Sequence, residues 1–250
     1  MACWKDMMAV VSTRAGVLFD LDGTLYDLER PMRLALKAIA PEHLREVIED
    51  RFWNCYFSRE NSQPDDVNQF VGVILEAAVG EPGWKSRGGE LMELFLSQVA
   101  PHRGVTEFLA ELASRDVPMG IVTNGPMVFQ MAKLRRLGLD RWFNQENLFA
   151  PGGLVEPKPS PGIFQQACSA LGLDPRRSVF VGDNPYTDSG AVDAGMVTVL
   201  VQPQSQCGAA LQRPPTHEDV ELSRRLSSPR LHRVLRFEEA ARFVKCLILG

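Results

Sequence analysis

The chain has 250 residues, of which 45% are hydrophobic and 23% are charged, and its formal net charge at pH 7 is −4. These values predict a soluble globular protein with enough residues for one large core, or for a core and a smaller domain. The negative charge argues against a nucleic-acid platform, and no apolar run approaches the roughly 20 residues of a membrane-spanning helix.

The first predicted element is a short apolar strand, Val17–Phe19, which leads directly into Asp20, Asp22 and Gly23. Residues two apart on a strand share a face, so we expect the two carboxylates to lie close together where the chain turns. Two carboxylates about 4 Å apart at an effective dielectric of about 20 repel by roughly 4 kcal/mol, which predicts a bound cation or a proton on one of them. The alternative is a surface turn rich in Asp and Gly, which the preceding apolar strand disfavours.

About 100 residues separate this segment from the next predicted strand, far more than a strand-to-helix connection needs. We therefore expect an inserted domain over residues 28–100. Apolar residues recur there at helical spacing, which predicts a small helical bundle. Its helices are expected over 32–39, 44–52, 70–77 and 91–95, with breaks near Pro41, Asn61–Pro64 and Gly80–Gly83.

The core is expected to resume with a helix over 105–112 and a strand over Val117–Val122. That strand ends in a Thr-Asn-Gly run that contains Thr123 and Asn124. Polar residues at the carboxyl end of a strand stand where open α/β sheets bind ligands. Further along, Lys158 stands between prolines just before a helical pattern. A lone lysine is usually solvated, so this residue by itself is a weak indication of a site.

A buried strand is predicted over Ser178–Gly182, and it ends in Asp183; Asp188 follows at the expected start of a helix. An aspartate at a helix start is often only a cap. The polar residues nevertheless follow successive strands in a consistent order, which chance explains poorly. The alternation of strands and helices up to Val201 predicts an α/β fold with a parallel sheet covered on both faces.

The last part of the chain is predicted to contain an extension or loop over residues 203–230, which begins with a stretch rich in Gln, Pro and Gly. A late edge strand is expected over His232–Phe237, followed by a terminal helix over Glu238–Leu249. These elements would complete a core formed by residues 1–27 and 101–250.

The cysteines and the first residues bear on location. The five cysteines are spread along the chain without a Cys-x-x-Cys pair, at Cys3, Cys55, Cys168, Cys207 and Cys246. They predict reduced thiols in a cytoplasmic protein. The first 14 residues lack an adequate signal-peptide core, so we do not expect secretion. The four histidines are scattered, and none is assigned as a ligand.

Four features occur in a fixed order along the chain, namely DLDGTLYD at 20–27, Thr123, Lys158 and GDNPYTD at 182–188. They resemble the motifs of the haloacid dehalogenase-like (HAD) superfamily, in particular its phosphatases with a helical cap inserted after the first motif. The resemblance covers roughly residues 16–201, and the first motif is the most specific. It implies a Rossmann-like parallel sheet with an inserted small α-helical cap.

The same resemblance implies the roles of the aspartates. Asp20 would attack the phosphorus atom of a phosphomonoester and form an aspartyl-phosphate. Asp22 would protonate the leaving oxygen and later deprotonate the attacking water. Mg²⁺ would be held by Asp20, by the backbone carbonyl of Asp22 and by Asp183.

Four further residues would act around the phosphoryl group. Lys158 would offset its negative charge, and Thr123 with neighbouring backbone N–H groups would hydrogen-bond its oxygens. Asp188 would orient Lys158 or a metal-bound water. Asn124 would position the phosphoryl group or Asp20.

The chain is therefore expected to be a cytoplasmic, Mg²⁺-dependent phosphatase of a small phosphorylated metabolite, such as a sugar phosphate, a nucleoside monophosphate or a phospho-acid. Family members that hydrolyse haloacids lack the second aspartate of the first motif, so Asp22 favours phosphoester chemistry. A phosphosugar mutase is one alternative. A catalytically idle binding or regulatory protein is the other, which the intact set of site residues disfavours. No nucleic-acid or membrane partner is expected.

Overall fold

The computed structural model describes residues 14–59, 65–202 and 217–250. The predicted break at 61–64 and most of the predicted loop after 202 lie outside the described residues, as do Cys3 and Cys207. Within the described ranges, no helix is both long and apolar enough to cross a membrane.

In the described part of the chain, six parallel strands form a sheet in the order β3-β2-β1-β4-β5-β6. The central strands β1, β2 and β4 are buried throughout, as expected for a parallel sheet covered on both faces. The α/β fold is thus confirmed. The strands are β1 (Val17–Phe19), β2 (Met119–Val122), β3 (Leu148–Phe149), β4 (Val179–Gly182), β5 (Val197–Val201) and β6 (Leu231–Val234).

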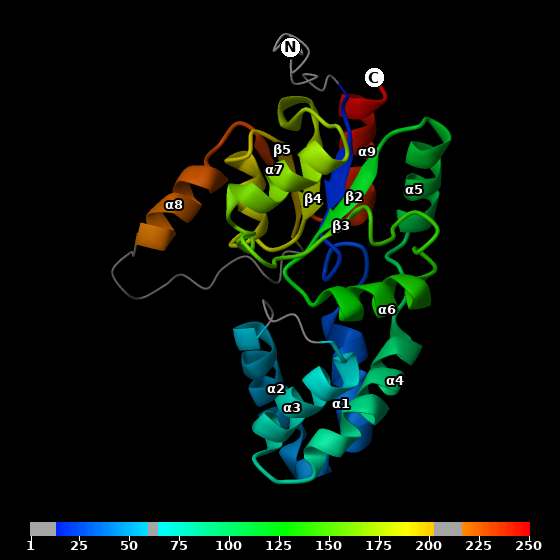
Figure 1. The fold of residues 1–250 in the computed structure, drawn as a ribbon, viewed down its shortest axis with the longest axis vertical. Coiled ribbons are helices and arrows are strands. Elements are labelled where there is room, and N and C mark those ends of the chain that lie inside the picture. The colour runs from blue at the N-terminus through cyan, green and yellow to red at the C-terminus, as the bar shows by residue number, and fades with distance from the viewer. Residues whose placement is uncertain (1–13, 60–64, 203–216) are drawn as a thin grey trace, which may run out of the picture.

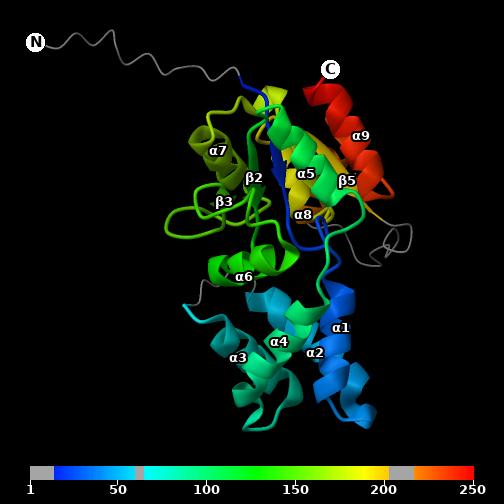
Figure 2. The same ribbon diagram turned by 90° about the vertical axis from the view of Figure 1, so that its right-hand side faces the viewer.

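Alternate residues of β1 point to opposite faces of the sheet and into two separate cores. Val17 and Phe19 belong to the larger core, which α5 (Val105–Ser114) and α9 (Phe237–Ile248) help to build. Leu18 packs in the smaller core under α7 (Pro161–Ala170). Figure 2 shows α7 on one side of the sheet and α5 and α9 on the other. Helices therefore cover both faces, as predicted.

The inserted segment folds into a small helical cap, and its helices lie together at one end of the molecule (Figure 1). Ile74, Leu75 and Phe95 are fully buried in its interior. All of its described α-helices fall within the predicted range 28–100. They are α1 (Glu29–Ile39), α2 (Arg45–Arg59), α3 (Val67–Val79) and α4 (Gly88–Gln98).

The chain leaves the sheet for the cap and returns from it at adjacent points. Tyr26 forms an isolated bridge with Pro101. Beside it, the N–H of His102 donates to the carbonyl of Leu25 at 2.9 Å. The segment that leaves the sheet and the segment that returns to it are therefore hydrogen-bonded to each other within the first motif.

Helix α6 (Met127–Leu137) lies between the cap and the sheet (Figures 1 and 2). Its residue Phe129 contacts Tyr56 and Phe95 of the cap, with ring centroids 6.4 and 5.8 Å apart. Near its end, Arg136 Nε donates to the carbonyl of Leu96 at 2.7 Å. The helix that follows the Thr-Asn-Gly run is thus attached to the cap at both ends.

The C-terminal region contains the predicted edge strand, β6, and the predicted terminal helix, α9. The predicted extension also contains a helix, α8 (His217–Leu226), whose Arg224 and Arg225 pair with Asp193 at 2.7 and 2.6 Å. The helix expected at Asp188 is only a short 3-10 helix, η5 (Asp188–Val192). It ends just before Gly195, where a φ of +92° turns the chain.

Candidate active site

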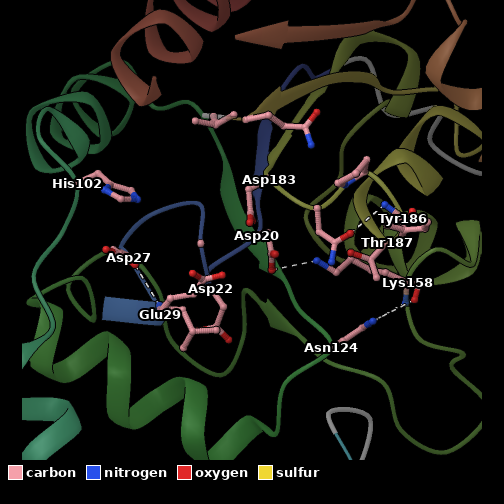
Figure 3. A pocket seen from close by; sticks show the side chains of 16 residues that line it. Asp20, Asp22, Asp27, Glu29, His102, Asn124, Lys158, Asp183, Tyr186 and Thr187 are labelled. Carbon is pink, nitrogen blue, oxygen red and sulfur yellow. Dashed lines mark hydrogen bonds and ion pairs between the residues drawn. The ribbon is translucent and has the colours of Figure 1, made fainter. Parts of the chain in front are cut away.

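A cavity of about 560 Å³ opens at the carboxyl ends of β1 and β4, where the strand order of the sheet reverses (Figure 3). Open α/β sheets place their ligand sites at such a switch point. Five of the seven predicted site residues line the cavity, namely Asp20, Asp22, Asn124, Lys158 and Asp183. Thr123 and Asp188 are buried and are not among the lining residues.

Lys158 joins two of the predicted aspartates. Its Nζ lies 3.0 Å from Asp20 Oδ1 and 2.6 Å from Asp188 Oδ1 (Figure 3 shows the first contact). All three side chains are buried. Burial by itself would lower the pKa of Lys158, but the two carboxylates outweigh burial and raise it. Lys158 is therefore a permanent cation beside Asp20.

Asp188 also holds the loop that follows β4. Its Oδ2 accepts the N–H groups of Asp183 and Asn184 at 2.9 and 3.0 Å. Gly182 stands against this carboxylate, and a Cβ atom there would overlap it. One buried side chain thus fixes both the ammonium of Lys158 and the backbone that carries Asp183.

Asp183 completes a group of three carboxylates. One oxygen each of Asp20, Asp183 and Asp188 lies within 4.8 Å of the others. The hydroxyl of Thr24 donates to Asp183 Oδ1 at 2.8 Å. Burial and the charge of Asp188 nevertheless raise the pKa of Asp183 to about 8. Burial also raises the pKa of Asp20, even though Lys158 opposes the shift.

These oxygens fit a hard divalent cation. Mg²⁺ prefers carboxylate and carbonyl oxygens together with water, and it is bound by one or two carboxylates in most enzyme sites. Burial first, and neighbouring carboxylates second, raise the pKa values of Asp20 and Asp183, although Lys158 opposes both shifts. A cation at this position would stabilise the ionised form of both carboxylates.

Thr123 and Asn124 both make contacts within the protein. Thr123 Oγ1 accepts the N–H of Gly125 at 3.1 Å. The amide of Asn124 accepts the backbone N–H of Lys158 at 2.8 Å and donates to its carbonyl at 3.0 Å. Asn124 therefore positions the backbone of Lys158, and its expected role toward the phosphoryl group or Asp20 stays a prediction.

The environment of Asp22 differs from the expected one. Strand β1 ends at Phe19, so the rule that residues two apart share a face does not apply to Asp20 and Asp22. The group of three carboxylates does not include Asp22. Lys133 Nζ lies 2.7 and 2.8 Å from the two oxygens of Asp22 instead. The negative charge of Asp22 is thus compensated by the ammonium group of Lys133.

Two more buried side chains bind the same carboxylate. Gln130 Nε2 donates to Asp22 Oδ2 at 2.8 Å, and the hydroxyl of Tyr26 donates to Oδ1. Burial would raise the pKa of Asp22, but the charge of Lys133 and the three hydrogen-bond donors outweigh it and lower the pKa. The contacts in this structure therefore favour the ionised carboxylate of Asp22, which is the form that can accept a proton as a base.

Sequence reasoning missed Tyr26, Gln130 and Lys133. A signal for two of them was present, because Gln130 and Lys133 stand on the same helical face as the buried residues Leu134 and Leu137. Fully buried lysines are almost always paired with an acidic group, so a lysine on the apolar face of a helix indicates a buried acidic partner. His102 and Tyr186, which also line the cavity, carried no comparable signal.

Comparison with known proteins agrees with this geometry. A family model described as haloacid dehalogenase-like hydrolase matches residues 15–195. N-acetylmuramic acid 6-phosphate phosphatase of Pseudomonas aeruginosa is 30% identical over 187 residues, which is 74% of this chain and 80% of that protein. Glyceraldehyde 3-phosphate phosphatase of Methanopyrus kandleri is 29% identical over 195 residues, covering 74% of this chain and 83% of the relative.

Among solved structures, that of a dehalogenase with an intermediate complex superposes with a TM-score of 0.65 at 25% identity. The superposition covers 94% of this chain and 99% of the other. The sheet and the helical cap described above therefore both occur in a solved relative.

Proposed function

We propose a mechanism and a substrate class for this chain, which belongs to the haloacid dehalogenase-like hydrolase family and is a phosphomonoester phosphatase. Asp20 is the nucleophile. The observation that carries this assignment is its position, at the carboxyl end of the central strand, on the cavity and 3.0 Å from the ammonium of Lys158. A carboxylate fixed beside a permanent cation is placed to meet a phosphate group.

The reaction has two balanced steps. In the first, an oxygen of Asp20 forms a bond to phosphorus while the bond to the leaving oxygen breaks, and Asp22 gives that oxygen its proton. In the second, water attacks phosphorus, Asp22 takes up a proton from the water, and the bond between phosphorus and Asp20 breaks. Inorganic phosphate leaves, Asp20 is again a carboxylate, and Asp22 returns to solvent the proton that it took from the water.

The ionised state of Asp22 suits the second step directly. For the first step Asp22 needs a proton, which it takes up from solvent when substrate binds, because the negative charge of a bound phosphate group raises the pKa of a neighbouring carboxyl. Substrate binding therefore supplies the condition under which Asp22 acts as an acid. Lys158 offsets the charge on the phosphoryl oxygens in both steps.

Asp20, Asp183 and the backbone carbonyl of Asp22 would hold Mg²⁺. When bound, the ion supplies positive charge that offsets the repulsion between Asp20 and the phosphate. The cluster of carboxylate oxygens supports this assignment, as do the raised pKa values of Asp20 and Asp183. Asp188 faces Lys158 and orients it.

Removal and return of Mg²⁺ is the test of this site. The purified chain is expected to hydrolyse p-nitrophenyl phosphate with Mg²⁺ and to lose this activity with a chelator. At about 100 times the dissociation constant, binding stabilises the fold by about 2.7 kcal/mol, or roughly 5–10 °C in the melting temperature. Asp183→Asn should abolish this shift, whereas Asp140→Asn, at an exposed position, should keep it. A full shift in Asp183→Asn would contradict the assignment.

The substrate is a small sugar phosphate. The two relatives named above are phosphatases of N-acetylmuramic acid 6-phosphate and glyceraldehyde 3-phosphate. Asp27 and Glu29, which are both exposed, line the cavity together with His102 and Tyr186. Carboxylates accept hydrogen bonds from sugar hydroxyls, so these two side chains suit the hydroxyl groups of a sugar phosphate.

A test of substrate size follows from the helical cap. The segment 28–100 stands beside Asp20, and its closure would exclude both water and bulky substrates. We expect kcat/KM for the best small sugar phosphate to exceed that for phosphopeptides and phosphoproteins by at least about 100-fold. Release of inorganic phosphate, measured over a panel of metabolites, is the assay, and an isomerised sugar phosphate in its place would indicate a mutase. Equal efficiency on a phosphoprotein would mean that the cap is a docking surface.

The acid role of Asp22 predicts a dependence on the leaving group. An alkoxide needs a proton as it leaves, whereas p-nitrophenolate does not, so Asp22→Asn should slow phosphorylation by an alkyl phosphate about 100-fold more than by p-nitrophenyl phosphate. Single-turnover rates of the two substrates measure this ratio. An equal loss for both leaving groups would leave Asp22 without a role as an acid.

A further inference from the structure

The side chains that bind Asp22 form a buried polar cluster next to the nucleophile. Gln130 and Lys133 come from α6, and Tyr26 comes from the end of the first motif; all three are fully buried. Lys133 bridges both oxygens of the carboxylate, at 2.7 and 2.8 Å. The side-chain amide of Gln130 also donates to Asp22 Oδ2, at 2.8 Å.

Both oxygens of Asp22 are therefore held, which fixes the plane of the carboxylate. Gln130 Nε2 also lies 2.8 Å from Thr123 Oγ1, so the same amide joins the first and second motifs. Gly125 stands against Gln130, and a Cβ atom at this position would overlap the amide nitrogen. The glycine of the Thr-Asn-Gly run thus makes room for Gln130 to reach Asp22.

The cluster has a rigid support. The ammonium of Lys133 lies 3.9 Å from the ring centroid of Phe129, which packs against Tyr56 and Phe95 of the cap. Arg136 attaches the end of α6 to the carbonyl of Leu96. The helix that holds Asp22 is therefore held in turn by the cap.

A purely structural purpose explains this cluster poorly. Burying a lysine and an aspartate removes both from water, and a well-packed apolar pair of similar volume is often as stable or more stable. In this pair the aspartate is Asp22, which lines the cavity and is the proposed acid and base. Catalytic groups need such supporting contacts, because their geometry must be held closely for proton transfer.

We propose that Lys133 and Gln130 are positioning residues, which fix the carboxylate of Asp22 for proton transfer to the leaving group and from water. The inference rests on the proposed function, in which Asp22 is the acid and base. It adds that this role depends on two side chains of α6 that bind the carboxylate of Asp22 directly.

The test compares Lys133→Met with wild type in single-turnover and pre-steady-state experiments. With an alkyl phosphate we expect phosphorylation to slow at least about 100-fold, and with p-nitrophenyl phosphate by less than about 10-fold. Hydrolysis of the aspartyl-phosphate should slow as well. Lys133→Met should then release one p-nitrophenol per active site in a burst, followed by slow turnover.

Two further variants make the result decisive. Arg135→Met removes a positive charge from the exposed face of the same helix and should leave both rates unchanged. Gln130→Leu removes one donor and should shift the ratio of alkyl to aryl rates in the same direction, by about 10-fold. If Lys133→Met does not fold, as judged by circular dichroism, Gln130→Leu alone decides.

An equal loss for both substrates without a burst, or no loss at all, would overturn the positioning role. Asp22→Asn distinguishes the two levels of the proposal. If Asp22→Asn shows the leaving-group dependence and the α6 variants do not, the inference fails and the proposed function stands. If Asp22→Asn also lacks the dependence, the acid and base role itself fails.

Discussion

Asp20→Asn is expected to reduce turnover below about one thousandth of the wild-type value while the fold stays intact. The amide keeps the shape of the carboxylate but lacks its nucleophilicity, so the covalent step cannot occur. Folding should not suffer, because the substitution removes one charge from a group of three neighbouring carboxylates. Phosphate release and circular dichroism measure the two outcomes.

The control for Asp20→Asn is Asp140→Asn, which makes the same chemical change at an exposed position and should keep full activity. Mass spectrometry must show that the new amide has not deamidated back to a carboxylate. Near-normal turnover in a verified variant would exclude Asp20 as the nucleophile, whatever the other aspartates do.

Lys158→Met is expected to cost both activity and stability. The ammonium is the partner of Asp20 and Asp188 at 3.0 and 2.6 Å, so its loss leaves two buried carboxylates without this cation. Removal of one partner from a buried ion pair costs roughly 3–5 kcal/mol. The free energy of unfolding in urea, measured without Mg²⁺, gives this value, and turnover should fall by at least about 1,000-fold.

Two companion variants show whether charge is the cause. Lys85→Met, at an exposed position of the cap, should change the unfolding free energy by less than about 0.5 kcal/mol. The double variant Lys158→Met with Asp188→Asn should regain part of the lost stability, since it also removes one unpaired charge, but none of the activity. An unfolding free energy that stays unchanged in Lys158→Met would contradict the pairing.

The positions of Asp20, Thr123 and Asp183 are predictable from the sequence because a parallel sheet brings the carboxyl ends of its strands to one edge. Each residue follows an apolar run that is recognisable as a buried strand. The cap helices are predictable for a similar reason, since their apolar residues recur at helical spacing over long segments.

The partners of Asp22 and Asn124 are not predictable in this way. Asp22 lies beyond the last residue of β1, so its direction depends on the turn and not on the strand. Lys133 reaches it from a helix 111 positions away along the chain, and no local pattern specifies how that helix docks. Asn124 pairs with backbone groups, which leave no trace in the sequence.

Among the strands in the described part of the chain, β1 is the one synthesised first. β1 pairs with β2 on one side and with β4 on the other, and these partners are synthesised about 100 and 160 residues later. The cap is synthesised during the first of these intervals, and its contacts are local enough to form quickly. The sheet, in contrast, must close long loops before β1 gains a neighbouring strand. During synthesis the helical cap can therefore fold before the sheet does. Until β2 is made, Val17–Phe19 is an unpaired apolar segment that a chaperone or a second nascent chain can bind.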